Sequence, residues 1–142
     1  MKKVNVALVG LGFGGAFAEI YKAHPQVGEL TVFDTDKALE AVFRQRLGIE
    51  REYVSFEEVL ADETVDAVHL VTPIPLHEEQ SVAVLEAGKH CACTVPMAIS
   101  LEGIRRITEA KRRSRKKYMM METTLYTYQF FYVRQMLEHG RL

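Results

Sequence analysis

The chain has 142 residues, of which 48% are hydrophobic and 26% charged, and its formal net charge is −1, so its composition is that of a globular domain rather than of a disordered or strongly basic protein. No apolar run approaches the roughly 18 residues that span a bilayer, and the amino-terminal residues lack the cleavage pattern of a secretory signal. Two cysteines are too few for a disulfide framework, so the expected compartment is the reducing cytoplasm.

The first predicted element is a strand, Val4–Val9, and its continuous apolar run suits burial on both faces. The glycines at positions 10, 12 and 15 then form the pattern G-x-G-x-x-G at the start of a predicted helix, Gly15–His24. Gly10 permits a tight turn, Gly12 lets a pyrophosphate approach the backbone, and Gly15 lets the helix pack close to the strand. A glycine turn that binds nothing is the disfavoured alternative, because the helix amides here face the expected phosphates. The predicted cofactor-binding residues of this turn are Gly10, Gly12, Phe13, Gly14 and Gly15.

The second predicted strand, Leu30–Asp34, ends in a carboxylate. Asp34 follows the glycine turn at the spacing at which dinucleotide-binding domains place the acceptor for the ribose 2′-hydroxyl. Its negative charge would repel the 2′-phosphate of NADP(H), and Thr35 and Asp36 supply no arginine to bind that phosphate. The sequence therefore predicts that NAD(H) binds in preference to NADP(H), with Asp34 and Thr35 beside the cofactor.

The rest of the chain alternates strands with helices. The further predicted strands are residues 66–72, 90–95 and 117–122. The further predicted helices are residues 36–47, 56–61, 76–87, 100–113 and 127–139. This alternation produces right-handed βαβ units and a parallel sheet. The predicted fold is a single α/β domain over residues 1–142, a Rossmann-type doubly wound parallel sheet with helices on both faces in three α/β/α layers.

Several side chains in these elements are predicted to fill the core. His69 lies within a buried strand and is expected to be a hydrogen-bonded core residue rather than a metal ligand. Cys91 and Cys93 are expected to be buried small hydrophobes rather than a metal or redox pair, and no metal site is predicted. The methionines of the last predicted strand, Met119–Met121, are also expected to fill core space. The last predicted helix carries an apolar stripe of Phe130, Val133, Met136 and Leu137.

Eight of the eighteen basic residues lie between Arg105 and Lys117. Such a cluster could contact a nucleic acid or another polyanion. No aromatic residue is interleaved within it, as binding to a single strand would favour. A solvated helix face is therefore the favoured interpretation, and neither a nucleic acid nor a membrane is a predicted partner.

Three stretches together resemble the amino-terminal domain of the glucose–fructose oxidoreductase/inositol dehydrogenase (Gfo/Idh/MocA) family. They are VALVGLGFGG, VHLVTPIPLHEEQSVAVLEAGKHCACTVPMAISLEGIRRITEAKR and YMMMETTLY, and the resemblance covers essentially the whole chain. It implies that the Thr-Pro turn at Thr72, Pro73 and Ile74 lies along the cofactor. By the same resemblance, His77 shapes the nicotinamide side and Thr94 belongs to the cofactor-binding residues.

The chain departs from the family pattern at the residues that carry chemistry. The family usually has Glu-Lys-Pro where this chain has Thr94-Val95-Pro96, and Val95 cannot perform the lysine's proton transfer. The METTLY stretch replaces a glycine–aromatic–asparagine stretch and puts Glu122 and Tyr126 at the carboxyl end of the last strand, where open α/β sheets bind ligands. We therefore expect Val95, Glu122 and Tyr126 to be substrate-pocket candidates. The alternative for Glu122 is a simple ion pair with a nearby arginine.

The family resemblance also implies a second, substrate-binding domain, which is absent from these 142 residues. The chain is thus expected to be either an isolated nucleotide-binding domain or part of a longer protein. The expected function is that of an NAD(H)-binding domain of an oxidoreductase, which transfers hydride between nicotinamide and a hydroxyl-bearing carbon of a sugar or polyol-like small molecule. The isolated fragment is expected to be inactive, and no residue is assigned as catalytic. The alternative is a non-catalytic nucleotide-binding, sensing or interaction module that has lost the family lysine. Association into a homo-oligomer is left open.

Overall fold

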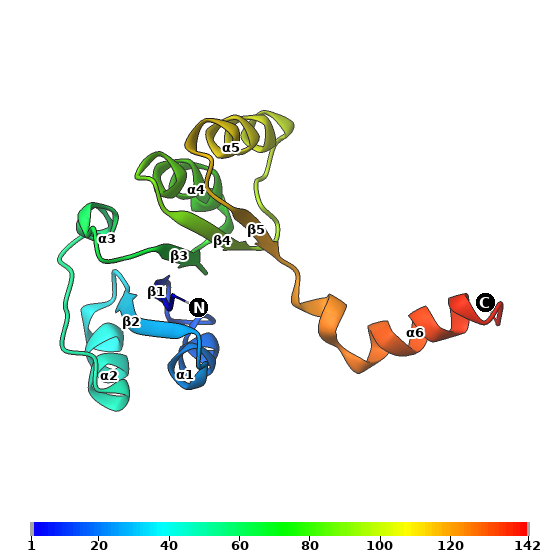
Figure 1. The fold of residues 1–142 in the computed structure, drawn as a ribbon, viewed down its shortest axis with the longest axis horizontal. Coiled ribbons are helices and arrows are strands. Elements are labelled where there is room, and N and C mark those ends of the chain that lie inside the picture. Colours follow the sequence, from blue (N-terminus) through cyan, green and yellow to red (C-terminus); the bar gives the residue numbers. More distant parts are fainter. Residues whose placement is uncertain (1, 142) are drawn as a thin grey trace.

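The structure, a computed structural model, describes residues 2–141 and contains a five-stranded parallel sheet with the order β2-β1-β3-β4-β5 (Figure 1). The strands are β1 (Val4–Val9), β2 (Val27–Phe33), β3 (Ala67–Leu70), β4 (His90–Thr94) and β5 (Tyr118–Met121). Because β2 and β3 pair with opposite edges of β1, the strand order reverses at β1. Ligand crevices of open α/β sheets form at such a switch point, outside the carboxyl ends of the strands.

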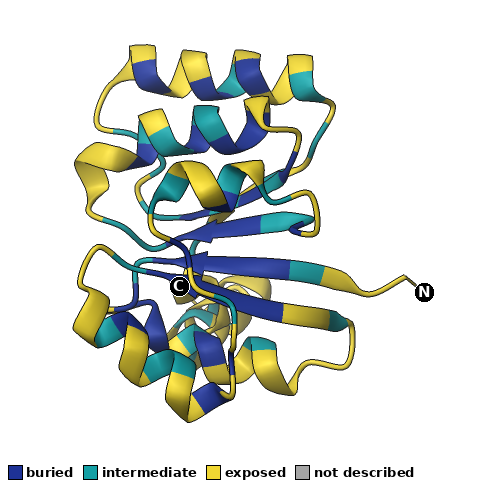
Figure 2. Cartoon of the chain, turned by 90° about the vertical axis from the view of Figure 1, so that its left-hand side faces the viewer, coloured by how far each residue is buried: buried dark blue, intermediate teal, exposed yellow. Residues whose placement is uncertain are grey.

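Helices cover both faces of the sheet, which confirms the predicted Rossmann-type α/β/α fold (Figures 1 and 2). The helices α1 and α2 pack on one face, and α3, α4 and α5 lie over the other. The α-helices are α1 (Gly15–Ala23), α2 (Lys37–Leu47), α3 (Phe56–Ala61), α4 (His77–Glu86), α5 (Leu101–Ser114) and α6 (Tyr128–Glu138). Two short 3₁₀ helices are η1 (Ile74–Leu76) and η2 (Thr123–Tyr126). No helix within residues 2–141 is long and apolar enough to cross a bilayer.

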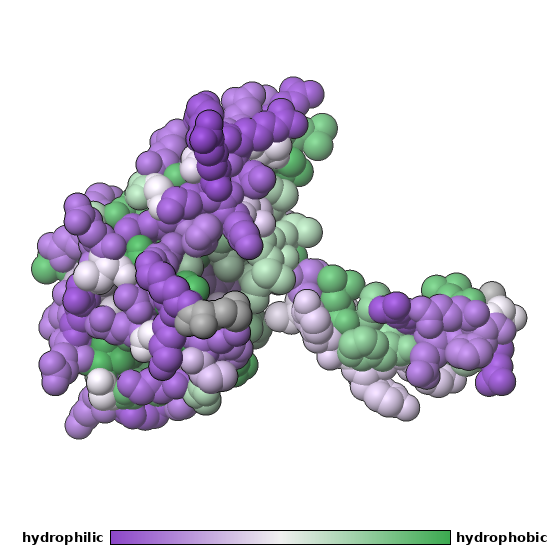
Figure 3. Space-filling view, in the orientation of Figure 1, coloured by the Kyte–Doolittle hydropathy of each residue, from purple (hydrophilic) through white to green (hydrophobic). Residues whose placement is uncertain are grey.

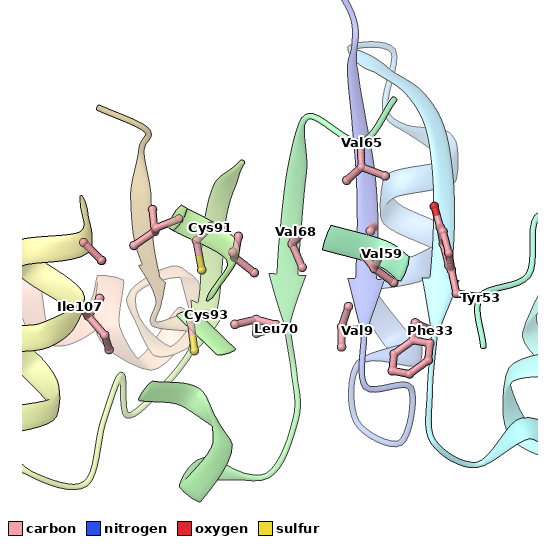
Figure 4. Packing of buried hydrophobic residues seen from close by; sticks show 14 residues of the cluster. Val9, Phe33, Tyr53, Val59, Val65, Val68, Leu70, Cys91, Cys93 and Ile107 are labelled. Carbon is pink, nitrogen blue, oxygen red and sulfur yellow. The ribbon is translucent and has the colours of Figure 1, made fainter. Parts of the chain in front are cut away.

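The central strands bury side chains on both faces, because successive residues of a strand point to opposite sides. On β1, Leu8 belongs to the cluster on the α1 and α2 side, whereas Val9 belongs to the larger cluster on the other side. Figure 4 shows that larger cluster extending from β2 across the sheet to α5. Its labelled members include Phe33, Val68, Leu70, Cys91, Cys93 and Ile107. Packing in the two clusters fixes the positions of the strand ends, and the candidate site lies at those ends.

Side-chain caps define several helix ends close to their predicted positions. The carboxylate of Asp36 accepts from two amides at the start of α2, and Ser55 Oγ accepts from the Glu58 amide at the start of α3. Ser100 Oγ accepts from the Gly103 amide at 2.9 Å at the start of α5. These caps satisfy amides that have no partner inside the helix. The strand β2 begins at Val27, earlier than predicted, because its first residues pair with the start of β1.

Helix α6 lies outside the core. It projects away from the sheet in Figure 1, and none of its residues is buried. Val133 and Leu137 of its apolar stripe are exposed. On the preceding strand, the prediction that Met119–Met121 fill core space is wrong for Met119 and Met120, which are exposed as well. Figure 3 shows apolar surface along the projecting segment. The helix that the amphipathic pattern predicts is present, and the element that it contacts most within residues 2–141 is the adjacent η2.

The basic cluster lies on and just after α5, the outermost helix of its layer. Arg106 pairs with Glu78 of α4 at 2.5 Å, and Arg113 pairs with Glu86 of α4 at 3.0 Å. These exposed ion pairs join the two helices across their solvent-facing sides. They support the interpretation of the cluster as a solvated helix face.

Asp62, at the end of α3, makes the stability of the fold depend on pH. Its carboxylate accepts hydrogen bonds from the Tyr53 hydroxyl at 2.7 Å and the Thr64 amide at 2.9 Å, and it pairs with Arg51. Burial opposes ionisation of this carboxyl, but hydrogen bonds from Thr64, Tyr53 and Arg51 outweigh burial and hold the pKa of Asp62 well below its usual range.

We expect Asp62→Asn to lower the free energy of unfolding by about 1–3 kcal/mol near neutral pH. A depressed folded-state pKa stabilises the fold above the unfolded-state pKa of about 3.9, and this contribution is lost as the pH falls from there toward the folded-state pKa. Urea unfolding at a series of pH values should therefore show the parent and the variant converging below about pH 4. A difference that stays constant into acid would contradict the prediction.

Candidate functional site

The turn between β1 and α1 lies against the turn that follows β3. Gly10 has a φ of +90°, and a Cβ built there would lie 2.5 Å from the carbonyl oxygen of Val71. Glycine is therefore required at this position both by its backbone conformation and by the neighbouring chain. The close approach of the two turns places the glycine sequence at the switch point of the sheet.

Gly14 and Gly15 serve packing. A Cβ on Gly14 would lie 2.0 Å from the carbonyl oxygen of Gly10, so Gly14 keeps the turn closed on itself. A Cβ on Gly15 would lie 2.2 Å from the ring of Phe43 in α2. The close contact that Gly15 permits is thus with helix α2, rather than with the strand that the sequence predicted.

Gly12 differs from these glycines because it borders open space. A Cβ on Gly12 would meet no heavy atom within 4 Å. Within residues 2–141 the amides of Gly12 and Phe13 donate no hydrogen bond to another group of the protein. Open space beside unpaired amides at the start of a helix fits a pyrophosphate. The residues of this turn therefore fit the dinucleotide that the sequence predicts.

Asp34 connects the glycine turn with the end of β2. Its Oδ2 accepts a hydrogen bond from the Leu11 amide at 2.6 Å, and its Oδ1 accepts one from the Asp36 amide at 2.9 Å. The sequence predicted Asp34 as a ribose acceptor, but it did not reveal this second role in holding the turn. Each carboxylate oxygen can accept more than one hydrogen bond, so Asp34 keeps acceptor capacity for a ligand.

A pocket of about 540 Å³ surrounds these groups. Most of the predicted cofactor-binding residues line it: Gly10, Gly12, Phe13, Asp34, Thr35, Thr72 and Pro73. Gln80 also lines the pocket, and its Oε1 accepts from the Thr72 hydroxyl at 2.5 Å. Sequence reasoning missed Gln80, although its place one helical turn after His77 is a signal that could have identified it.

His77 holds two turns of the site together from a buried position. One ring nitrogen, Nε2, lies 2.8 Å from the carbonyl oxygen of Thr72, and the other, Nδ1, lies 2.7 Å from the carbonyl oxygen of Pro96. Both contacts can be hydrogen bonds at once only if both nitrogens carry a proton, because carbonyl oxygens only accept. His77 thus connects the turn after β3 with the turn after β4.

A second pocket, of about 330 Å³, adjoins the first and shares Phe13, Val71 and Thr72 with it. It lies at the carboxyl ends of β4 and β5, and its other lining residues include Ile74, His77, Thr94, Val95, Met121 and Glu122. The structure therefore brings Val95 and Glu122 to one pocket. Tyr126 lines a separate apolar pocket of about 270 Å³, together with Glu122, Phe17 and Met119.

Glu122 stands at the start of η2. Its Oε1 accepts a hydrogen bond from the Thr124 amide at 2.8 Å, and hydrogen bonding with Thr124 lowers the pKa of the Glu122 carboxyl. Among the ion pairs of residues 2–141 none involves Glu122, so the alternative of a simple pair with an arginine is not found there. Glu122 is thus a carboxylate at the edge of two pockets.

The other chemically reactive side chains are buried away from both pockets. His69 Nδ1 lies 3.0 Å from the Tyr21 hydroxyl, and burial lowers the pKa of His69 to about 4. Burial also raises the pKa of the free thiol of Cys91 to about 12 and raises that of Cys93. These side chains are core residues, as the sequence predicts. Within the described part of the chain, no three His, Cys, Asp or Glu residues are grouped to hold a metal ion.

Three comparisons relate this geometry to known proteins. A crystal structure of an NAD-binding protein from Listeria innocua superimposes with a TM-score of 0.91 at 31% identity, over 99% of this chain and 40% of that one. The 1,5-anhydro-D-fructose reductase of Ensifer adhaerens is 35% identical over 60% of this chain and 26% of its own length. The α-N-acetylgalactosaminidase of Shewanella oneidensis is 29% identical over 99% of this chain and 33% of its own length.

The chain therefore spans about a third or less of the two curated relatives and well under half of the solved structure. The family model described as an oxidoreductase family with an NAD-binding Rossmann fold matches residues 4–122. This match includes the glycine turn, Asp34, His77 and Glu122. The chain belongs to the Gfo/Idh/MocA oxidoreductase family, and it forms the NAD-binding Rossmann domain of that family.

Proposed function

We propose that NAD(H) binds with its adenosine ribose at Asp34, its pyrophosphate at the glycine turn and its nicotinamide toward Thr94 and Val95. The open space at Gly12 is the observation that carries this orientation. Gly12 and Asp34 line the first pocket, and that pocket shares Phe13, Val71 and Thr72 with the second pocket, which Val95 lines. His77 orients the turns on either side of the nicotinamide end. Thr35, Thr72, Pro73 and Ile74 line the path between the two ends.

The activity that this arrangement supports best is hydride transfer between nicotinamide and a hydroxyl-bearing carbon of a sugar or polyol-like substrate. Bound NAD supplies the ring that accepts or donates the hydride. Two relatives are named for reactions on sugars, a reductase and a glycosidase, which supports sugars as the substrate class. In this arrangement Val95 and Glu122 lie beside the substrate, and Tyr126 lies farther out. We assign no residue as the proton acceptor.

We infer that residues 1–142 are the dinucleotide-binding domain and that a second domain forms the opposite wall of the substrate site in the complete protein. The partial coverage of every compared relative supports this organisation. The exposed apolar side chains of α6 are consistent with contact to further protein. The two buried free thiols support a reducing, cytoplasmic location.

A second candidate function is nucleotide binding without catalysis, in a sensing or interaction module. Val95 is the observation that favours it, because a valine beside the nicotinamide cannot donate, accept or titrate a proton. Both candidates require the same NAD(H) site. They differ in whether a complete protein turns over a substrate.

The orientation is tested by changing the charge of Asp34. We expect the parent chain to bind NADH at least about tenfold more tightly than NADPH, and Asp34→Asn to weaken NADH binding by about 10- to 100-fold while changing NADPH binding less. Asparagine keeps an acceptor for only one of the two amides that Asp34 holds, those of Leu11 and Asp36, so thermal unfolding checks that the variant stays folded. Calorimetric titration of both cofactors measures the ratio. Equal affinities of the parent chain for NADH and NADPH would contradict the role of Asp34.

A further inference from the structure

The groove formed by the two adjoining pockets contains two carboxylates. Asp34 lines the first pocket and Glu122 the second, and among the described residues neither a lysine nor an arginine lines either pocket. His77 also lines the second pocket from a buried position, with both ring nitrogens against backbone carbonyls. Substitution of Glu122 leaves His77 in place, so a comparison of the parent with a Glu122 variant isolates the contribution of the carboxylate.

The two redox states of the cofactor differ in charge at one place. The nicotinamide ring of NAD⁺ carries a formal positive charge, whereas the dihydronicotinamide ring of NADH is neutral. The pyrophosphate and the adenosine are the same in both, so their interactions with the groove cancel in the ratio of the two affinities. A carboxylate near the ring therefore favours the oxidised cofactor, and a cation near the ring favours the reduced one.

The surroundings of Glu122 strengthen this difference. Hydrogen bonding with Thr124 favours the ionised carboxyl, and no ion pair within residues 2–141 neutralises it. Val95, on the adjacent strand end, lines the same pocket and contributes no opposing positive charge. Thr94 is the neighbouring lining residue, and it is neutral.

We propose that Glu122 shifts the redox preference of the site toward NAD⁺, so that the site favours NAD⁺ over NADH more than the same site without the carboxylate does. The proposal rests on the orientation of the dinucleotide given above, with the nicotinamide at the second pocket. The carboxylate is exposed to solvent, so its contribution is about two- to fivefold in affinity. Because the carboxylate stabilises the oxidised ring relative to the reduced one, it makes bound NADH the better hydride donor, which favours reduction of a carbonyl over oxidation of a hydroxyl.

The test measures the ratio of the dissociation constants of NADH and NAD⁺ by calorimetry on the 142-residue chain. We expect Glu122→Gln to weaken NAD⁺ binding about two- to fivefold relative to the parent, with little change for NADH. Glutamine keeps the acceptor for the Thr124 amide, and thermal unfolding checks that the variant is folded. Glu109→Gln, which removes an exposed carboxylate from α5, is the matched control and should leave both affinities unchanged.

Two results would overturn the inference in different ways. If both cofactors bind and the ratio is the same in the parent and in Glu122→Gln, the redox preference is wrong while the proposed NAD(H) site stands. If neither cofactor binds to the folded parent, the proposed site fails and the inference fails with it. Raising the salt concentration should also move the parent ratio toward that of the variant, because exposed charge interactions are screened.

Discussion

Replacing Gly12 with valine is expected to abolish NAD(H) binding, with a loss of at least about 100-fold, while the chain stays folded. A Cβ at this position meets no heavy atom of the protein within 4 Å, so the free energy of unfolding should change by less than about 1 kcal/mol. The valine side chain instead occupies the space beside the unpaired amides, where we place the pyrophosphate. Calorimetry of NADH binding and thermal unfolding of the same samples measure both effects.

Gly14→Val is the structural counterpart of this variant. Its Cβ would lie 2.0 Å from the carbonyl oxygen of Gly10, so it should destabilise the fold by several kcal/mol, about 3 or more. The substitutions Gly12→Val and Gly14→Val thus distinguish a loss of NADH binding from a loss of folding stability. If Gly12→Val bound NADH with the affinity of the parent, the glycine turn would not be the phosphate site.

The fold could be predicted from the sequence because its determinants are local. The apolar run of Val4–Val9 needed only its own length and the following glycines to indicate a buried strand, and the structure has the same bounds. The caps at Asp36, Ser55 and Ser100 each act within three residues of themselves. Alternation of such elements leaves few topologies other than a parallel doubly wound sheet.

The features that could not be predicted depend on contacts between distant segments. Asp34 holds the Leu11 amide, and His77 connects the turns at Thr72 and Pro96, but neither contact leaves a periodic trace in the sequence. Helix α6 illustrates another limit of the sequence. Its apolar residues recur at helical spacing, but that spacing does not show which surface, if any, covers them.

The 142-residue chain is expected to produce no NADH from NAD⁺ with sugars, polyols or 2-hydroxy acids above the rate of a blank. Hydride transfer requires the substrate carbon to be held close to the nicotinamide, and such positioning contributes roughly 7–11 kcal/mol to lowering the barrier. Within residues 2–141 the pocket beside Val95 and Glu122 is formed by one domain alone. Steady NADH production that Gly12→Val abolishes would show this expectation to be wrong.

Val95→Lys tests whether turnover is limited by the lack of a proton acceptor or by the lack of a second domain that positions the substrate. In the 142-residue chain we expect no gain in turnover, because a lysine supplies a titratable amine but does not position the substrate. In a complete protein with a substrate-binding domain, the same change should raise turnover by about 10²- to 10⁴-fold if no other group has replaced the lysine, since that is the usual contribution of a positioned acid or base. If a complete protein is active and gains nothing from Val95→Lys, another residue accepts the proton. Glu122→Gln would then be the first variant to test for that role. No turnover in either version of a complete protein that binds NAD⁺ would favour the non-catalytic module.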